Sequence, residues 1–370
     1  MSEHHIQVVP GPANYYSHPG AIARLADYYS EAQLCKAFWV TGQQALAAAR
    51  PWLQPWLDLP GAKLSVFSGH CSESEVAVLA QVAGEDRHVV IGVGGGTVLD
   101  TAKALAHRLG IPVVTLPTIA ATCSAWTPLS VWYNDAGEAL KFVIFPQANH
   151  LLLLEPQIIL QAPSRYLLAG IGDTLAKWYE AVVLATDPAA LPLTVRLGLD
   201  VAKTLRDLLL EKSESALADQ RTQQLTQAFC DVVDAIVAGG GMVGGLGERY
   251  TRIAAAHAVH NGLTVLPQTA QFLHGTKVAY GILVQSALLG QDDVTAQLIE
   301  AYKRFELPTT LAQLAIDIQQ RDQVDRIIEH TLRPVESIHY LPITLTPATL
   351  LAALEKVEAL GQSTPSGQGH

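Results

Sequence analysis

The order of strand-like and helical segments changes near residue 163, and this change strongly constrains the fold. Before it, short β-rich runs alternate with helical stretches, whereas after it helical stretches follow one another with almost no strand signal. The expected strands are 37–41, 63–67, 88–93 and 113–116, and the expected helices between them are 43–53, 73–83 and 98–109. We therefore predict an α/β domain with a parallel sheet at 1–162 and an all-α domain at 163–370.

Composition excludes several classes of protein. Hydrophobic residues make up 49% of the 370 residues and charged residues 16%, which is too apolar for a disordered chain. The net charge of -10 argues against nucleic acid as a partner. The four scattered cysteines indicate a reducing compartment, and the first residues lack a signal-peptide pattern. The longest apolar runs fall short of the roughly 20 residues of a membrane span, so we expect a cytoplasmic protein without a membrane partner. We also expect a disordered tail at 361–370.

A glycine-rich loop, 92–97, follows a predicted buried strand and opens a helix. In that position backbone N–H groups and the positive end of the helix can face a phosphate. The Rossmann pattern GxGxxG is not matched, because Thr97 stands where its last glycine belongs. Either the loop is a tight βα turn, or it binds a pyrophosphate as a variant of that motif. Asp100 and Lys103, one turn apart, either form a surface ion pair or approach the nicotinamide or the substrate.

Small hydroxyl side chains fill the segment 117–130, which begins where a predicted strand ends. Ligands of open α/β sheets bind beyond the carboxyl ends of the strands, so this segment is placed to line a binding site. Cys123 could be a nucleophile, but no histidine lies near it in sequence, which favours a non-catalytic cysteine.

Polar residues interrupt three apolar helical stretches of the second domain. Asp173 lies in one, His257 and His260 lie in another, and His274 opens a third. A single histidine on an apolar helix is usually a core residue. Two imidazoles and a carboxylate together can instead bind Zn²⁺ or Fe²⁺ and leave positions open for substrate. On spacing alone, either His257 or His260 could be the ligand.

Several motifs point to one family. The segments GVGGGTVLDTAKALA, GIGDTLAKWYEA, AAAHAVHNGLTVLP and FLHGTKVAYGILVQ resemble the iron-containing alcohol dehydrogenase superfamily, in its glycerol dehydrogenase branch. The resemblance covers nearly the whole chain. It implies a Rossmann-like first domain of the dehydroquinate synthase type and an all-α second domain.

The resemblance also implies roles for individual residues. The metal ligands would be Asp173, His257 and His274, with His260 a nearby non-ligand. The dinucleotide-binding residues would be Gly94, Gly95, Gly96 and Thr97 at the pyrophosphate, and Thr118, Thr127, Leu129 and Tyr133 at the nicotinamide.

Three positions depart from the family pattern. Lys177 stands where iron-type members carry a further histidine, which favours zinc over iron. Cys123 stands where glycerol dehydrogenases carry an aspartate that contacts the polyol, which argues against glycerol. No acidic residue stands at 40–43, where the first predicted strand ends, so NADP is plausible besides NAD. Lys177 either forms a salt bridge with Asp173 or Glu180, or binds a substrate carboxylate.

We therefore expect a metal-dependent oxidoreductase that reduces 2-oxo acids to 2-hydroxy acids with NADP or NAD. A glycerol or diol dehydrogenase is the first alternative. A lyase like 3-dehydroquinate synthase and a non-catalytic relative are the others. A homo-oligomer is possible.

Overall fold

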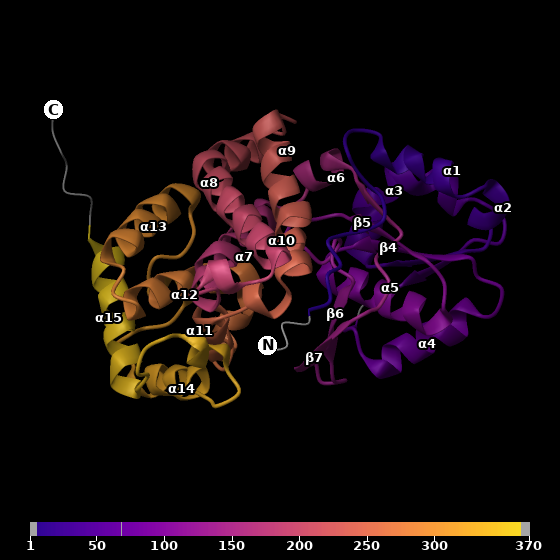
Figure 1. Cartoon of the computed structure of the whole chain (residues 1–370). Helices are drawn as coiled ribbons and strands as arrows, with labels where there is room; N and C mark the ends of the chain where they lie inside the picture. Colours follow the sequence, from indigo (N-terminus) through magenta and orange to yellow (C-terminus); the bar gives the residue numbers. More distant parts are fainter. Residues whose placement is uncertain (1–5, 68, 364–370) are drawn as a thin grey trace. The chain divides into compact units, whose positions relative to one another are not determined.

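The structure is a computed structural model that describes residues 6–67 and 69–363. These residues form two compact units (Figure 1). The α/β unit contains residues 8–167 and 218–245, and the helical unit contains residues 6–7, 168–217 and 246–363. The segment 218–245 therefore packs with the α/β unit although it follows long helices in the sequence. The assignment of a dinucleotide domain to 1–162 and a metal domain to 163–370 stays a prediction.

A six-stranded parallel sheet forms the centre of the α/β unit, in the order β1-β8-β5-β4-β2-β3. A separate antiparallel hairpin, β6–β7, follows β5 in the chain. The strands are β1 (Tyr15–Ser17), β2 (Ala37–Thr41), β3 (Lys63–Val66), β4 (Val89–Gly94), β5 (Val113–Pro117), β6 (Leu129–Tyr133), β7 (Ala139–Ile144) and β8 (Leu151–Leu154). The predicted parallel sheet is confirmed, and all four expected strands are present.

Helices of this unit cover both faces of the sheet. One apolar cluster contains residues of α1 (Leu25–Tyr28), α2 (Glu31–Leu34), α3 (Gln43–Leu57) and α6 (Pro156–Leu160), and the other contains residues of α4 (Glu73–Ala83) and α5 (Gly96–Leu109). The unit also contains α9 (Gln227–Asp234) and most of α10 (Gly240–Gly247). Side chains alternate along β2, so Trp39 packs in the cluster that contains α3 residues, and Phe38 packs with α4 and α5. From β2 the chain passes through α3 to β3 on one side, and from β4 it passes through α5 to β5 on the other side, so the direction of the connections reverses between these neighbouring strands. Nucleotide ligands of open α/β sheets bind at such a switch point.

The helical unit contains no strand among its described residues. Its helices are most of α7 (Ser164–Leu184) and α8 (Leu193–Arg221), and α11 (Ala255–Leu263), α12 (His274–Leu288), α13 (Asp292–Phe305), α14 (Arg321–Thr331) and α15 (Pro347–Gln362). Shorter turns lie in both units: 3-10 helices at Ala21–Arg24, Pro188–Ala190, Glu248–Thr251, Pro267–Gln271, Ala312–Leu314 and Ser337–Tyr340, and a π-helix at Ala235–Gly239. The predicted tail 361–370 begins inside α15, and residues 364–370 lie outside the described residues.

One stretch, Gln227–Thr251, is long and apolar enough to cross a membrane by length and composition. The expectation that no apolar run reaches this length was therefore wrong. Half of its most apolar window is buried inside the protein. Its Asp234 accepts hydrogen bonds from Tyr15 Oη at 2.5 Å and Ser17 Oγ at 2.6 Å. These contacts anchor the stretch to β1, and the absence of a membrane partner stays a prediction.

Candidate metal centre

Two glycines allow α7 and α12 to pack closely beside the predicted ligands. A Cβ atom on Gly275 would lie 1.9 Å from the carbonyl oxygen of Ala169, and one on Gly172 would lie 2.4 Å from the carbonyl oxygen of Gly275. Any larger residue at either position would push the two backbones apart. Gly172 precedes Asp173 in α7, and Gly275 follows His274 in α12. The close approach therefore brings these two side chains together.

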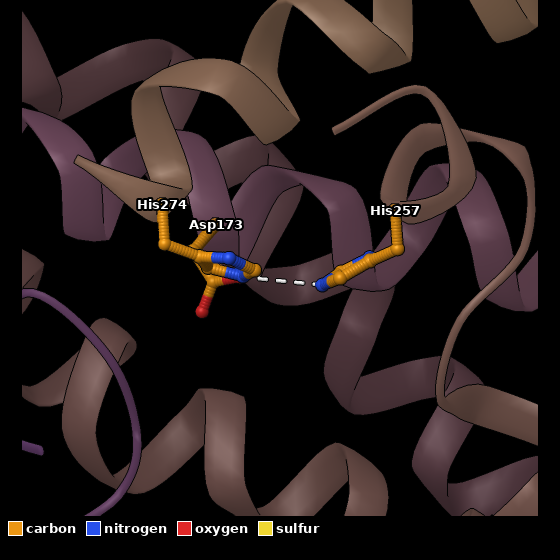
Figure 2. A group of neighbouring side chains, drawn as sticks. All are labelled: Asp173, His257 and His274. Atoms are coloured by element: carbon orange, nitrogen blue, oxygen red, sulfur yellow. Dashed lines mark ion pairs between the residues drawn. The ribbon is translucent and has the colours of Figure 1, made fainter. Parts of the chain in front are cut away.

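The three predicted ligand side chains converge (Figure 2). Asp173 Oδ1 lies 3.3 Å from His274 Nε2 and 3.7 Å from His257 Nε2. One ligand atom from each of the three residues lies within 4.8 Å of the other two. Zinc bonds of about 2.0 Å in tetrahedral geometry place ligand atoms roughly 3.3 Å apart. The donor set and its spacing therefore fit one divalent ion.

Hydrogen bonds occupy the other ring nitrogen of each histidine. His257 Nδ1 lies 2.6 Å from Glu180 Oε2, and His274 Nδ1 lies 3.0 Å from His260 Nε2. His260 Nδ1 lies in turn 3.0 Å from Asn261 Oδ1. If His260 donates its Nδ1 proton to Asn261, its Nε2 accepts from His274, and His274 Nε2 keeps its lone pair. His260 therefore orients a ligand and does not belong to the triad.

Electrostatics at the triad favour a charged carboxylate. Burial raises the pKa of Asp173, but the positive charge of Lys177 and hydrogen bonds from the two histidines outweigh burial and hold that pKa well below its usual range. Any Nε2 proton that makes such a hydrogen bond would be released when a metal ion binds. Burial likewise lowers the pKa of His257, but the Glu180 and Asp173 carboxylates outweigh it and raise the pKa to about 9. Burial, together with the neighbouring histidines, lowers the pKa of His260 well below its usual value. His260 is thus held neutral between groups that it hydrogen-bonds.

The predicted pyrophosphate residues lie at the switch point of the sheet. Gly94 ends β4, Gly95 is the N-cap of α5, and Gly96 and Thr97 form its first turn. No side chain caps this helix, so its first N–H groups are available to an anion. A Cβ on Gly95 would lie 2.7 Å from Ile119 and would crowd this end of the helix. The uncapped, glycine-lined helix end therefore fits a pyrophosphate.

The predicted nicotinamide residues lie on the segments that follow. Thr118 comes directly after β5, and its N–H donates to the carbonyl of Gly94 at 3.1 Å, which joins the two loops. Leu129 and Tyr133 are the first and last residues of β6. Thr127 lies in the loop before β6. All of these residues belong to the α/β unit.

Comparisons with known proteins agree with this architecture. The sequence model of iron-containing alcohol dehydrogenases matches residues 12–155. The chain is 68% identical to hydroxycarboxylate dehydrogenase A of Escherichia coli, covering 97% of this chain and 99% of that protein. It belongs to the iron-containing alcohol dehydrogenase family.

Further members of the family resemble the chain over nearly its whole length. Glycerol dehydrogenase of Pseudomonas putida is 35% identical, covering 96% of this chain and 98% of that protein. The crystal structure of glycerol dehydrogenase from Schizosaccharomyces pombe superposes with a TM-score of 0.83 at 29% identity, covering 96% of this chain and 91% of that one. The predicted family, fold and enzyme class, a dehydrogenase, are confirmed. Proteins of this family bind a nicotinamide dinucleotide and a metal.

Asp100 and Lys103 form an ion pair at 2.9 Å. The pair is buried, so the prediction of an ion pair on the surface was wrong. The Lys103 side chain is 1% exposed, and its Nζ donates to the carbonyls of Ser124 at 2.8 Å and Thr127 at 3.1 Å, and to that of Leu129. The pair therefore fastens the hydroxyl-rich segment to α5. Its role in the described structure is to hold the segment that carries predicted cofactor residues.

Cys123 and Lys177, two of the three departures from the family pattern, lie in different units. Cys123 is half-buried in the loop after β5, where its carbonyl accepts from the N–H of Trp126 at 3.0 Å. Lys177 is half-buried on α7, one turn after Asp173, and its charge acts on that carboxylate. Their assignment to substrate binding stays a prediction.

Glu180 and Gln285 were missed by the sequence analysis as parts of the metal centre. Glu180 was considered only as a possible partner of Lys177. It lies seven residues after Asp173, a spacing that places both on one face of α7 and could have indicated its role. Gln285 hydrogen-bonds only backbone groups of other elements, for which the sequence offers no signal.

Proposed function

We propose that this chain is a metal-dependent oxidoreductase that interconverts a 2-oxo acid and its 2-hydroxy acid with a nicotinamide dinucleotide. The observation that carries the proposal is the convergence of Asp173, His257 and His274 beside the positive charge of Lys177. The 68% identity to a protein named hydroxycarboxylate dehydrogenase A supports the same substrate class.

The metal would be held by Asp173 Oδ1 and by the Nε2 atoms of His257 and His274. When bound, such an ion supplies Lewis acidity for a carbonyl and stabilises negative charge on its oxygen. Glu180 and His260 hold the two imidazoles with their Nε2 atoms toward the carboxylate. Lys177 offers an ammonium group to the substrate carboxylate, an interaction that a neutral polyol cannot make.

The N-terminus of α5 would bind the pyrophosphate through the N–H groups of Gly96 and Thr97. The segment 118–133, fastened by Lys103, would line the nicotinamide. NADP is slightly favoured over NAD because residues 40–43, at the end of β2 and just after it, contain no carboxylate that would repel a 2′-phosphate.

Zinc is favoured over iron because Lys177 replaces a possible fourth protein ligand. The scattered cysteines and the dehydrogenase relatives support a cytoplasmic location, and a homo-oligomer is plausible.

Glycerol or diol oxidation is the second candidate. It is favoured by the relatives named glycerol dehydrogenases, with 35% identity in the Pseudomonas putida protein. Cys123 argues against it, because a thiol accepts hydrogen bonds far more weakly than a carboxylate does.

A reduction assay over a panel of 2-oxo acids with NADH and NADPH tests the proposal, with glycerol oxidation measured alongside. We expect turnover of 2-oxo acids that a chelator abolishes and added Zn²⁺ restores. In the matched variant His274→Ala, both activity and bound metal should be lost while the circular dichroism spectrum is kept. Faster oxidation of glycerol than of any 2-hydroxy acid would select the second candidate, and chelator-resistant activity would refute the metal centre.

A further inference from the structure

The first turn of α11 is buried, and its orphan N–H groups are satisfied by two side chains from other helices. A helix start leaves its first four N–H groups without partners inside the helix. Glu180 Oε1 accepts the first and last N–H of residues 254–257, at 2.7 and 3.0 Å. Gln285 Oε1 accepts the two between them, at 3.0 and 3.1 Å. Glu180 comes from α7 and Gln285 from α12, the helices that carry the other two ligands.

The two capping side chains differ in one respect. Glu180 uses its second oxygen, Oε2, to bind His257 Nδ1 at 2.6 Å. Gln285 uses its amide Nε2 to donate to the carbonyl of Tyr179 on α7 at 2.7 Å, and it does not touch the His257 ring. Both side chains are fully or almost fully buried, at 0% and 2% exposure. They therefore share the capping of α11, and only Glu180 also controls an imidazole.

We propose that Glu180 is a positioning residue of the metal centre: it keeps a proton of His257 on Nδ1, so that Nε2, which faces Asp173 and His274, is the nitrogen that binds the metal (Figure 2). A carboxylate in this place has only acceptor atoms, so the His257 nitrogen that faces it must carry a proton. Gln285 anchors the same helix without setting the ring. This inference rests on the proposed metal centre and does not depend on the substrate.

The substitution Glu180→Gln separates the two roles of Glu180. The amide oxygen of glutamine can still accept the two backbone N–H groups of α11. Its NH₂ group then faces His257 Nδ1 and can only donate, which requires an unprotonated Nδ1 and moves the ring proton to Nε2. An Nε2–H group cannot bind a metal. The variant should therefore keep the helix cap and lose a metal ligand.

Zn²⁺ affinity, measured by competition with a chromophoric chelator on the full-length chain, is the first readout. Glu180→Gln should bind Zn²⁺ about 10- to 100-fold more weakly than the unsubstituted chain, with a similar thermal unfolding midpoint. Gln285→Leu is the matched control, because it removes two caps from the same helix turn. It should lower the unfolding midpoint and weaken Zn²⁺ binding less than Glu180→Gln does.

The ¹⁵N–¹H correlation of His257 Nδ1, assigned by its loss in His257→Gln, is the second readout. It should be present in the unsubstituted chain with and without Zn²⁺ and absent in Glu180→Gln. Equal Zn²⁺ affinity in Glu180→Gln and in the unsubstituted chain would overturn the inference. The absence of the Nδ1–H correlation in the unsubstituted chain would also overturn it, and that measurement does not depend on how well the variant folds. A chain that binds no Zn²⁺ but shows the correlation would refute the metal centre and leave the role of Glu180 at His257 intact.

Discussion

Replacing Lys103 by methionine should release the segment 118–130 from α5. The Lys103 ammonium is buried and donates to the carbonyls of Ser124, Thr127 and Leu129 while it pairs with Asp100. Methionine has a similar length and keeps most of the apolar contacts of the lysine stem. The change therefore removes the charge and its hydrogen bonds with little change of volume.

The expected magnitude follows from what remains buried. Removing one partner of a buried ion pair typically costs about 3–5 kcal/mol. Asp100 keeps two other partners, the Ser124 hydroxyl at 2.6 Å and the N–H of Val131 at 3.0 Å, which places the expected cost near the lower limit. About 3 kcal/mol corresponds to a roughly 100-fold larger equilibrium constant for local opening.

Hydrogen exchange followed by mass spectrometry measures this opening segment by segment. Exchange in peptides that cover 122–131 should become roughly 100-fold faster in Lys103→Met, while peptides of the helical unit stay unchanged. Lys36→Met is the control, because Lys36 pairs with Asp86 on the surface and such pairs contribute about 0–1 kcal/mol. Asp100→Asn combined with Lys103→Met should cost less than Lys103→Met alone, since fewer buried groups are left unpaired. Unchanged exchange at 122–131 would refute the reasoning.

Three further changes test other parts of the structure. Gly275→Ala should destabilise the protein by about 1–3 kcal/mol and weaken Zn²⁺ binding, because the added Cβ would meet the backbone of α7. An unchanged thermal unfolding midpoint and an unchanged metal titration would contradict the packing argument. Burial raises the pKa of Asp234 in the folded chain. Between about pH 4, where the carboxyl loses its proton in the unfolded chain, and the higher pKa of the folded chain, the folded chain holds one more proton, so its stability falls as the pH rises. Asp234→Asn, whose amide oxygen can still accept from Tyr15, should therefore gain stability relative to the unsubstituted chain between pH 4 and 7 in urea unfolding, and a pH-independent difference would contradict this. Lys177→Ala should raise KM for 2-oxo acids about 10- to 100-fold and leave KM for neutral ketones nearly unchanged, and equal effects would exclude Lys177 from substrate binding.

Much of the α/β unit was predictable because its local patterns are strong. The strand Ala37–Thr41 and the helix Glu73–Ala83 have the bounds that the sequence predicted. The helix is marked by Ser72, whose side chain accepts from the N–H of Glu75 at 3.2 Å, and by Gly84 at its end. Signals of this kind lie within a few residues of the element that they define.

The strands that were missed depend on distant partners or on a turn. β1 has three residues and pairs with β8, whose residues lie far away in the sequence. β6 begins inside the segment 117–130 that was assigned to a ligand-lining loop, and its partner β7 was not predicted either. The turn 134–137, with Asn134 accepting from the N–H groups of Ala136 and Glu138, is a hairpin signal that could have identified them.

The ligand set could be named from the sequence only through a family resemblance, because nothing local connects three helices. The structure supplies the physical link. Gly172 and Gly275 bring two helices into backbone contact, and Glu180 with Gln285 ties the third to both. Each of these residues is uninformative alone: two glycines inside helices, and two polar residues on apolar faces.

Buried polar groups at these positions would destabilise the fold if they lacked partners. Glu180 has no exposed surface, yet both of its oxygens accept hydrogen bonds within α11. A helix start that water could reach would not need such a residue, since water would satisfy its N–H groups. Glu180 therefore both helps to cap the buried N-terminus of α11 and fixes the orientation of His257. This coupling means that a substitution which uncaps the helix also disturbs a ligand, whereas Glu180→Gln is expected to separate the two effects.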